Sequence, residues 1–178
     1  MTLYKNRYRI ETTRLRGWDY TQDGYYFITV CVKNRVCLLG DIIGGSMTLN
    51  EYGIIVNDCW FDLPNHYPNI KLDAFCIMPN HIHGIMVIDN GDMVGDTNVV
   101  DTGLKPVSTK KRHGLFEFVR ALKTFSSRRI NELRKSAGEN VWQPRFYDHI
   151  IRNDDSLQRI RDYIVKNPGS WPDDKFYK

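Results

Sequence analysis

Two apolar segments, residues 70–78 and 81–88, are separated only by the dipeptide Pro79-Asn80. Both are rich in β-branched and aromatic residues, which favour strands, and Pro-Asn suits a tight turn. Together they predict an antiparallel β-hairpin. Because an isolated hairpin is at best marginally stable in water, the rest of the chain must supply strands and helices that pack on it.

Two other segments predict further strands. Residues 25–32 (YYFITVCV) are aromatic and β-branched, as expected of a buried strand, and residues 145–151 form a shorter strand-like piece. Between the first of these and the hairpin, residues 34–50 contain three glycines and two short apolar runs. This composition predicts a small hairpin excursion from the main sheet.

Apolar residues at helical spacing predict three helices, over about 51–63, 115–136 and 155–167. Asn50 is suited to cap the first helix, and Asn153 or the residue after it is suited to cap the last. A proline follows the first and the last of these helices and should end each of them. The longest helix places its apolar residues on one face and most of its basic residues elsewhere.

The predicted order is strand, helix, strand, strand, helix, strand, helix. The first six elements match the ferredoxin-like βαββαβ pattern, so we predict an α+β fold with an antiparallel sheet and helices on one face, plus a C-terminal helix. The length of 178 residues fits one domain, 1–178. Residues 89–114 are rich in Gly, Asp, Thr and Asn without usable periodicity, and they predict a flexible surface loop.

Composition excludes two classes of protein. A hydrophobic content of 42% is too high for a disordered chain. No apolar run approaches the roughly 20 residues that span a bilayer, and the first eleven residues lack the apolar core of a signal peptide. We therefore expect a cytoplasmic protein. The four cysteines match no zinc or redox spacing and are expected to be reduced thiols.

Positive charge is concentrated in one part of the chain. The net charge is only +4, yet residues 105–135 hold ten Lys or Arg against two acidic residues. Such a segment suits a polyanionic partner, although a solvated helix face is an equally good interpretation of charge alone.

The hairpin carries the sequence His81-Ile82-His83. Residues two apart on a strand point to the same face, so both imidazoles should face one way while Ile82 turns into the core. Two neutral histidines so placed can supply two ligands of a divalent metal ion. The alternative is a chance pair of surface histidines, since His-x-His alone is common.

Three segments resemble the single-tyrosine HUH transposases, which include the insertion-sequence and the REP-associated tyrosine transposases. The first is 75–88 (FCIMPNHIHGIMVI), which holds the His-hydrophobic-His motif that gives HUH its name. The others are 142–153 (WQPRFYDHIIRN) and 161–168 (RDYIVKNP), in the order found in that family. The resemblance covers most of residues 25–171.

This resemblance implies a reaction, a cofactor and a partner. A tyrosine would attack a phosphodiester of single-stranded or hairpin DNA and leave a 5′-phosphotyrosine link and a free 3′-hydroxyl. A phenol with a pKa near 10 is a weak nucleophile at pH 7, so it needs a nearby cation. Mg²⁺ or Mn²⁺ suits a site that mixes imidazole with oxygen ligands. Some relatives act as dimers, which makes a homodimer an expectation here.

The resemblance also indicates which residues act. Tyr163 lies in the segment that carries the nucleophile in the family, and Asn167, one helical turn later, could complete the metal site with His81 and His83. Without the resemblance, Tyr163 would be interpreted as a packing residue and Asn167 as a helix C-cap. Tyr147 is the alternative nucleophile.

Seven basic residues are predicted to contact the DNA backbone: Lys110, Lys111, Arg112, Arg120, Lys123, Arg128 and Arg129. Two other functions fit the same residues. One is a domesticated DNA- or RNA-binding protein without turnover. The other is a metal-dependent nuclease that uses water as its nucleophile.

Overall fold

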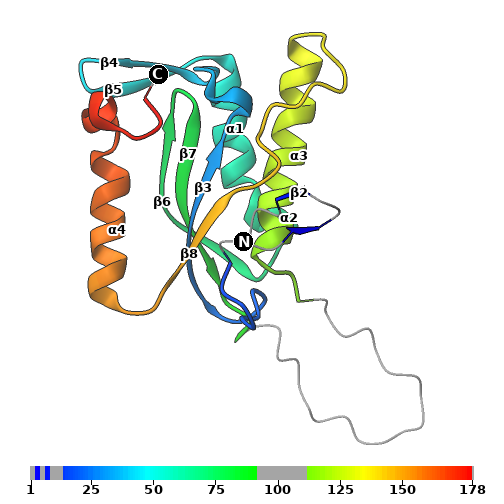
Figure 1. Cartoon of the computed structure of the whole chain (residues 1–178), viewed down its shortest axis with the longest axis vertical. Helices are drawn as coiled ribbons and strands as arrows, with labels where there is room; N and C mark the ends of the chain where they lie inside the picture. The colour runs from blue at the N-terminus through cyan, green and yellow to red at the C-terminus, as the bar shows by residue number, and fades with distance from the viewer. Residues whose placement is uncertain (1–2, 5–6, 9–13, 92–111, 178) are drawn as a thin grey trace, which may run out of the picture.

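The computed structural model describes residues 3–4, 7–8, 14–91 and 112–177. Figure 1 shows a sheet that separates helices on its two sides. The predicted loop falls largely on residues 92–111, outside the described part of the chain. Among the described residues no helix is long and apolar enough to cross a membrane.

The main sheet has four strands in the order β6-β7-β3-β8, and every neighbouring pair is antiparallel. This is the strand order of a ferredoxin-like βαββαβ unit, and it confirms the predicted fold class. The bounds are β3 (Gly24–Cys31), β6 (Ile70–Met78), β7 (His81–Ile88) and β8 (Tyr147–Ile151).

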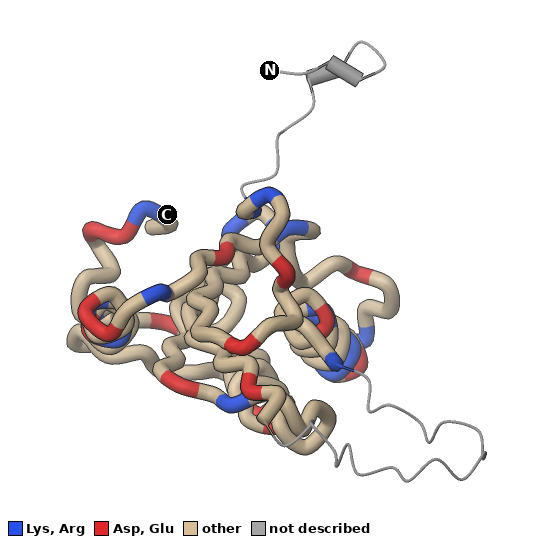
Figure 2. Tube along the Cα trace, turned by 90° about the horizontal axis from the view of Figure 1, so that it is seen from below, with Lys and Arg blue, Asp and Glu red and all other residues tan. Residues whose placement is uncertain are grey.

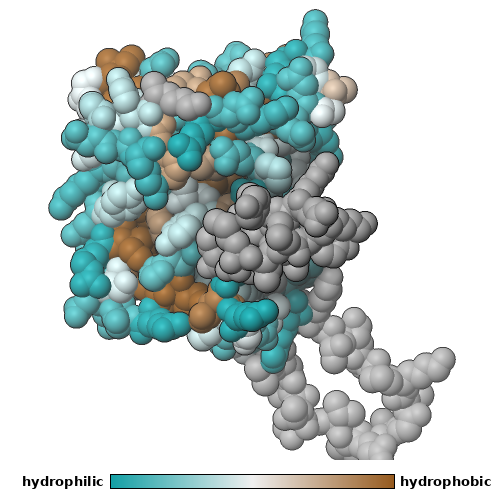
Figure 3. Space-filling model, in the orientation of Figure 1, coloured by the Kyte–Doolittle hydropathy of each residue, from teal (hydrophilic) through white to brown (hydrophobic). Residues whose placement is uncertain are grey.

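Helices cover both faces of this sheet (Figure 1). The first face carries α1 (Glu51–Phe61), the short α2 (Leu63–His66) and α3 (Leu115–Leu133), which pack over the main core. The fourth helix, α4 (Asp154–Lys166), lies on the opposite face and contacts β6. In Figure 3 the space between α4 and the sheet is apolar, whereas the outer surface of α4 is hydrophilic.

The predicted caps are present, and the predicted ends shift by a few residues. The side chain of Asn50 accepts hydrogen bonds from two backbone N–H groups of α1, and that of Asn153 accepts one from Ser156. The long helix ends at Leu133, before Lys135, whose φ of 54° is left-handed and cannot continue a helix.

The smaller elements lie around this sheet. Two hairpins are present, β1 (Leu3–Tyr4) with β2 (Arg7–Tyr8), and β4 (Gly40–Ile43) with β5 (Ser46–Leu49). The second is the predicted excursion, and its turn uses two glycines with positive φ, 58° and 78°. Two 3₁₀ segments complete the described part, η1 (Lys33–Arg35) and η3 (Pro168–Asp173).

Alternation along β7 divides its residues between the two faces. Ile82 and Met86 enter the main core under α1 and α3, whereas Ile85 belongs to the smaller core under α4. Gly84 also faces the first side, where the ring of Trp60 lies so close that a Cβ on residue 84 would meet it at 2.4 Å. The two histidines of β7 therefore face α4. The sequence predicted that they would share one face while Ile82 turns into the core, and this is confirmed.

Candidate active site

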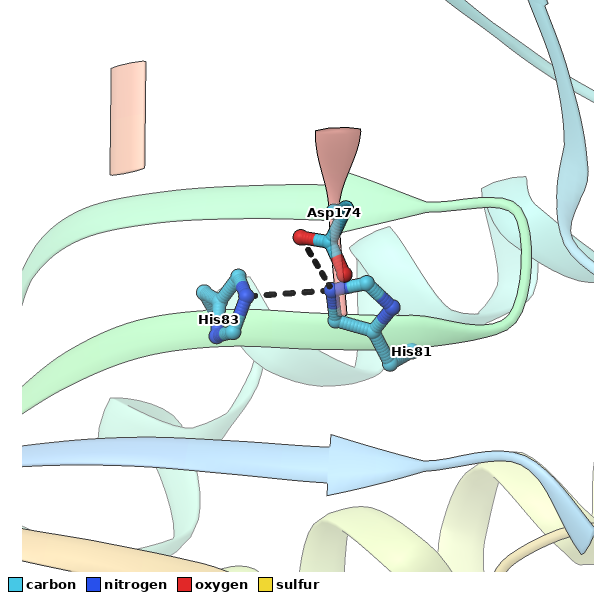
Figure 4. A group of neighbouring side chains, drawn as sticks. All are labelled: His81, His83 and Asp174. Atoms are coloured by element: carbon cyan, nitrogen blue, oxygen red, sulfur yellow. Dashed lines mark hydrogen bonds and ion pairs between the residues drawn. The ribbon is translucent and has the colours of Figure 1, made fainter. Parts of the chain in front are cut away.

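The side chains of His81 and His83 are completely buried on the α4 face of the sheet. Their Nε2 atoms lie 3.0 Å apart. Figure 4 shows the two rings on the same strand, with Asp174 of the C-terminal segment over His81. The interpretation as a chance pair of surface histidines is therefore wrong, because neither ring reaches the surface.

Each ring is fixed through its other nitrogen. Nδ1 of His81 lies 2.7 Å from Oδ1 of Asn80, and Nδ1 of His83 lies 2.8 Å from the hydroxyl of Thr29 on β3. The amide nitrogen of Asn80 donates to the carbonyls of Arg35 and Phe176, which leaves its oxygen to accept from His81. Oxygen partners of this kind orient the histidine ligands of metal sites and leave Nε2 free to bind.

Both imidazoles are held in the neutral form. Burial lowers the pKa of His81 to about 4, an effect that Asp174 partly opposes. Burial and the proximity of His81 lower the pKa of His83 well below its usual value. Neutral imidazole is the form that coordinates a metal, so neither histidine must lose a proton at pH 7 before binding.

Helix α4 brings the predicted nucleophile to this pair. The hydroxyl of Tyr163 lies 3.2 Å from Nε2 of His83, while 41% of the residue stays exposed to solvent. Burial of the hydroxyl end and the charge of Asp174 raise the pKa of Tyr163, and a hydrogen bond from the Asn167 side chain lowers it by less. Tyr163 is therefore accessible to a substrate at one side and in contact with the histidines at the other.

Asn167 ends α4 with its side chain buried, at 3% exposure. Its Oδ1 has no hydrogen-bond partner among the described residues. An unpaired buried carbonyl oxygen costs roughly 1–3 kcal/mol, and the same side chain is hydrogen-bonded to Tyr163, so this oxygen is available to a ligand next to the tyrosine. C-capping alone leaves this oxygen unexplained, because it accepts no backbone N–H.

An ion pair anchors α4 to the sheet. Arg161 donates through Nε and Nη2 to the two carboxylate oxygens of Asp73, at 2.9 and 2.5 Å. Asp73 lies at a β-bulge, where the register of β6 against β7 shifts between Leu72 and Phe75. The extra residue turns the carboxylate towards α4 and thereby fixes the helix that carries Tyr163.

Asp174 is a member of the site that the sequence did not predict. One of its oxygens lies 4.0 Å from Nε2 of His81, and its side chain is only 4% exposed. It lies directly after the 3₁₀ segment η3, which follows α4. The path of that segment cannot be predicted from periodicity in the sequence. The only signal in the sequence for this site residue is an acidic side chain shortly after residues 161–168, the segment that resembles the family.

The residues present fit a divalent cation. An octahedral ion with ligands at about 2.1 Å places adjacent ligands roughly 3.0 Å apart, which is the spacing between the two Nε2 atoms. The ligand atoms of His81, His83 and Asp174 all lie within 4.8 Å of one another. Imidazole nitrogen together with carboxylate and amide oxygen is a donor set that accepts Mn²⁺ and Mg²⁺.

Comparison with known proteins places the chain among transposases. It is 38% identical over 171 residues to an uncharacterized protein of Haemophilus influenzae, across 92% of this chain and 91% of that one. A second protein of that species, provisionally named a REP-associated tyrosine transposase, is 29% identical over 90% of this chain and 84% of its own length. The REP-associated tyrosine transposase of Escherichia coli is 23% identical over 89% and 80%.

The chain belongs to the tyrosine transposase family. No family model matches it. Its fold is that of a solved REP-associated tyrosine transposase bound to a REP hairpin, with a TM-score of 0.59 at 21% identity, over 88% of this chain and 73% of that one.

The residues predicted to contact DNA lie in separate parts of the chain. Lys110 and Lys111 lie outside the described residues. Arg112 is exposed just before α3. Arg120 and Lys123 line a groove between α3 and residues 139–146. Because the ammonium group of Lys123 also donates to the carbonyls of Gln143 and Pro144, it holds this groove together.

Arg128 and Arg129 complete the set, and both are exposed on α3. Arg128 forms an ion pair of 3.7 Å with Glu132. Figure 2 shows basic and acidic segments side by side on this helix. Contact of these residues with DNA therefore stays a prediction that rests on charge.

Tyr147, the alternative nucleophile, lies on β8 and faces the same side of the sheet as the histidines. The residue is 47% exposed, and its ring meets that of Phe27 edge-on, with 6.3 Å between the ring centroids. Phe27 itself stacks on His83 at 5.4 Å. Tyr147 thus lies one aromatic ring away from the histidines that Tyr163 contacts directly, which favours Tyr163 as the nucleophile.

Proposed function

We propose that this protein is a DNA transposase that cleaves and rejoins single-stranded DNA at hairpins, with Tyr163 as its nucleophile. His81, His83 and Asn167 would hold Mg²⁺ or Mn²⁺. The observation that carries the proposal is the 3.2 Å contact between the Tyr163 hydroxyl and Nε2 of His83. A nucleophile and two metal ligands, brought together from a helix and a strand, meet the geometric demands of phosphoryl transfer.

The proposed reaction exchanges one phosphodiester for another. The oxygen of Tyr163 bonds to the phosphorus, the bond from phosphorus to the 3′-oxygen breaks, and the strand leaves as a free 3′-hydroxyl. The phenolic proton passes to solvent water, and the departing 3′-oxygen takes up a proton from water. Attack of another 3′-hydroxyl on the phosphotyrosine reverses these steps and joins the strands. No external energy source is needed, because each step replaces one phosphoester bond with another.

Each residue of the site has a different role in this reaction. Asn167 donates a hydrogen bond that favours the phenolate of Tyr163, and Asn80 and Thr29 keep the histidine rings in position. When bound, a divalent cation would neutralise charge on the scissile phosphate and favour the ionised phenol. Because burial raises the pKa of Tyr163, the nucleophile depends on that positive charge.

The substrate class rests on the relatives and on charge. A related transposase has been solved bound to a REP hairpin, and residues 105–135 carry the basic excess that backbone contacts require. Assembly as a homodimer stays a prediction. A solution mass near that of one chain, 20.9 kDa, would contradict it.

Covalent trapping tests the proposed function. The full chain is incubated with single-stranded hairpin DNA and Mn²⁺, and a denaturing gel is searched for a shifted protein–DNA adduct. Peptide mass mapping should place the nucleotide on Tyr163. An adduct on Tyr147 would overturn the residue but keep the chemistry. Cleavage without any adduct would make the protein a nuclease that uses water, and hairpin binding without cleavage would make it a binding protein.

A further inference from the structure

We infer that Asp174 is an additional protein ligand of the divalent ion, so that the C-terminal segment 168–177 closes the metal site over the two histidines. This inference rests on the metal site of the proposed function. It adds a ligand from a third part of the chain, beyond β7 and the end of α4.

The position of the carboxylate is the first argument. Its Oδ2 lies 4.0 Å from Nε2 of His81, and one ligand atom from each of His81, His83 and Asp174 lies within 4.8 Å of the other two. Around an octahedral ion, ligands are roughly 3.0 Å apart when adjacent and about 4.2 Å when opposite. A movement of about 1 Å would bring Oδ2 of Asp174 from 4.0 Å to the adjacent-ligand spacing from Nε2 of His81.

The burial of the charge is the second argument. The side chain of Asp174 is 4% exposed, and no Lys or Arg of the described residues lies within 4.0 Å of it in an ion pair. Its ion-pair partner among the described residues is His81, whose imidazole burial keeps neutral, while the cationic side chains of Lys175 and Arg35 act on the site from farther away. A buried carboxylate requires a compensating cation, and a metal ion shared with the histidines supplies one.

The third argument is that the segment is built to hold Asp174 in place. Its Oδ1 accepts a hydrogen bond from the backbone N–H of Phe176 at 2.6 Å. The Asn80 amide, which also orients His81, donates to the carbonyl of Phe176 at 2.8 Å. The Phe176 ring lies 4.6 Å from the ring of His81. One oxygen of Asp174 is thus fixed by the backbone, and the other is left facing the histidines (Figure 4).

With His81, His83 and Asn167 of the proposed function, Asp174 would give the ion four protein ligands. A six-coordinate ion would then keep two positions for water or for oxygens of the scissile phosphate. The carboxylate would also neutralise part of the ion's positive charge. A site that includes Asp174 should therefore bind Mn²⁺ or Mg²⁺ more tightly than a site made of neutral ligands alone.

The first test measures Mn²⁺ binding to the full chain without DNA, from the electron paramagnetic resonance signal of free Mn²⁺. Asp174→Asn keeps the oxygen that accepts from Phe176 but removes the charge, and it should weaken binding by roughly tenfold or more. The matched control is Asp173→Asn, an exposed neighbour with the same change of charge, which should bind like the wild type. His83→Ala should abolish binding.

The outcomes separate this inference from the proposed function. Equal Mn²⁺ affinity of the wild type and Asp174→Asn, with binding lost in His83→Ala, would refute Asp174 as a ligand and leave the histidine site intact. Absence of Mn²⁺ binding by the wild type would refute the metal site itself.

A second test needs no substitution and so does not depend on how a variant folds. Fe²⁺ replaces Mn²⁺, ascorbate and hydrogen peroxide are added, and mass spectrometry locates the backbone cleavage caused by radicals formed at the ion. We expect cleavage beside both 81–83 and 173–175, and none with EDTA. Cleavage beside the histidines alone would place the C-terminal segment away from the ion and overturn the inference.

Discussion

The hydroxyl of Tyr163 lies 3.2 Å from Nε2 of His83, although 80 positions separate the two residues in the sequence. The phenol comes from α4 and the imidazole from β7, so their contact depends on how the helix docks on the sheet. Ile164, next to the tyrosine, is fully buried and anchors the apolar side of α4. The Arg161–Asp73 ion pair anchors the polar side.

Replacing the nucleophile should separate binding from cleavage. Tyr163→Phe keeps the helix and the ring but removes the attacking oxygen, so we expect hairpin affinity within about twofold of the wild type and cleavage below detection. Gel shift and a cleavage assay measure the two properties. Tyr147→Phe, on the same face of the sheet, is the matched control and should keep cleavage. Residual cleavage by Tyr163→Phe would show that another group attacks.

Loosening the helix should affect catalysis more than DNA binding. Arg161→Gln removes the bidentate pair with Asp73 and should cost about 1–2 kcal/mol of stability. Because Tyr163 is only two residues away, the cleavage rate should fall by roughly tenfold or more. Urea unfolding and single-turnover kinetics measure these effects. Arg159→Gln, an exposed arginine on the same helix, is the control and should change neither property.

Much of the fold follows from local sequence. The apolar runs on either side of Pro79-Asn80 predicted β6 and β7 at their observed bounds. Asn50 and Asn153 mark the starts of their helices because capping is a local interaction. The pairing of His81 and His83 on one face follows from the two-residue period of a strand. The choice of Tyr163 among ten tyrosines needed the family resemblance.

The rest of the site depends on contacts between distant segments. Thr29 meets His83 because β3 and β7 pair in a particular register, with Thr29 opposite His83. Asp73 reaches Arg161 because of the β-bulge in β6, which periodicity in the sequence does not predict. Asp174 arrives at the histidines after a 3₁₀ turn whose direction is set by packing of Trp171 and Phe176, not by local propensity. Sequence patterns of period 2 or 3.6 carry no information on such contacts.

The hydroxyl of Thr29 should matter for metal binding. It is the partner of His83 Nδ1, at 2.8 Å. Thr29→Val has nearly the same shape but lacks the hydroxyl, and loss of such a partner typically costs 10–100-fold in metal affinity. Thr29→Ser keeps the hydroxyl and should bind Mn²⁺ within a few fold of the wild type. Calorimetric titration with Mn²⁺ measures both, and equal affinities would contradict the role given to Thr29.

Gly84 should be intolerant of a side chain. An added Cβ would meet Cη2 of Trp60 at 2.4 Å, and the tryptophan ring is held by stacking on Phe75 at 4.2 Å. Gly84→Ala should therefore lower the free energy of unfolding by about 1–3 kcal/mol, as overpacking does in other cores. Gly169→Ala is the control, because its nearest neighbour would lie at 3.9 Å. Urea unfolding that shows equal stability for both variants would contradict this account.

Acid should destabilise the protein through its buried histidines. Burial lowers the pKa of His81 from its usual 6.5 to about 4 in the folded chain. Above pH 6.5 the residue is neutral in both states and contributes no difference. As pH falls below 6.5, His81 becomes protonated in the unfolded chain but not in the folded one. The free energy of unfolding therefore decreases progressively until about pH 4. A shift of this size corresponds to about 3 kcal/mol.

The lowered pKa of His83 acts in the same direction. Urea unfolding of the metal-free protein in EDTA at several pH values between 7 and 4 measures this loss. Carboxylates such as Asp73 also contribute in acid, because the Arg161 hydrogen bonds lower the pKa of Asp73. The informative quantity is therefore the difference from His81→Gln, which cannot titrate at this position and should lose about 3 kcal/mol less over the same range. An equal loss of unfolding free energy in the two proteins would show that His81 is protonated as easily in the folded state as in the unfolded one. The conclusion that His81 is neutral at the site and able to bind a metal ion without losing a proton would then be wrong.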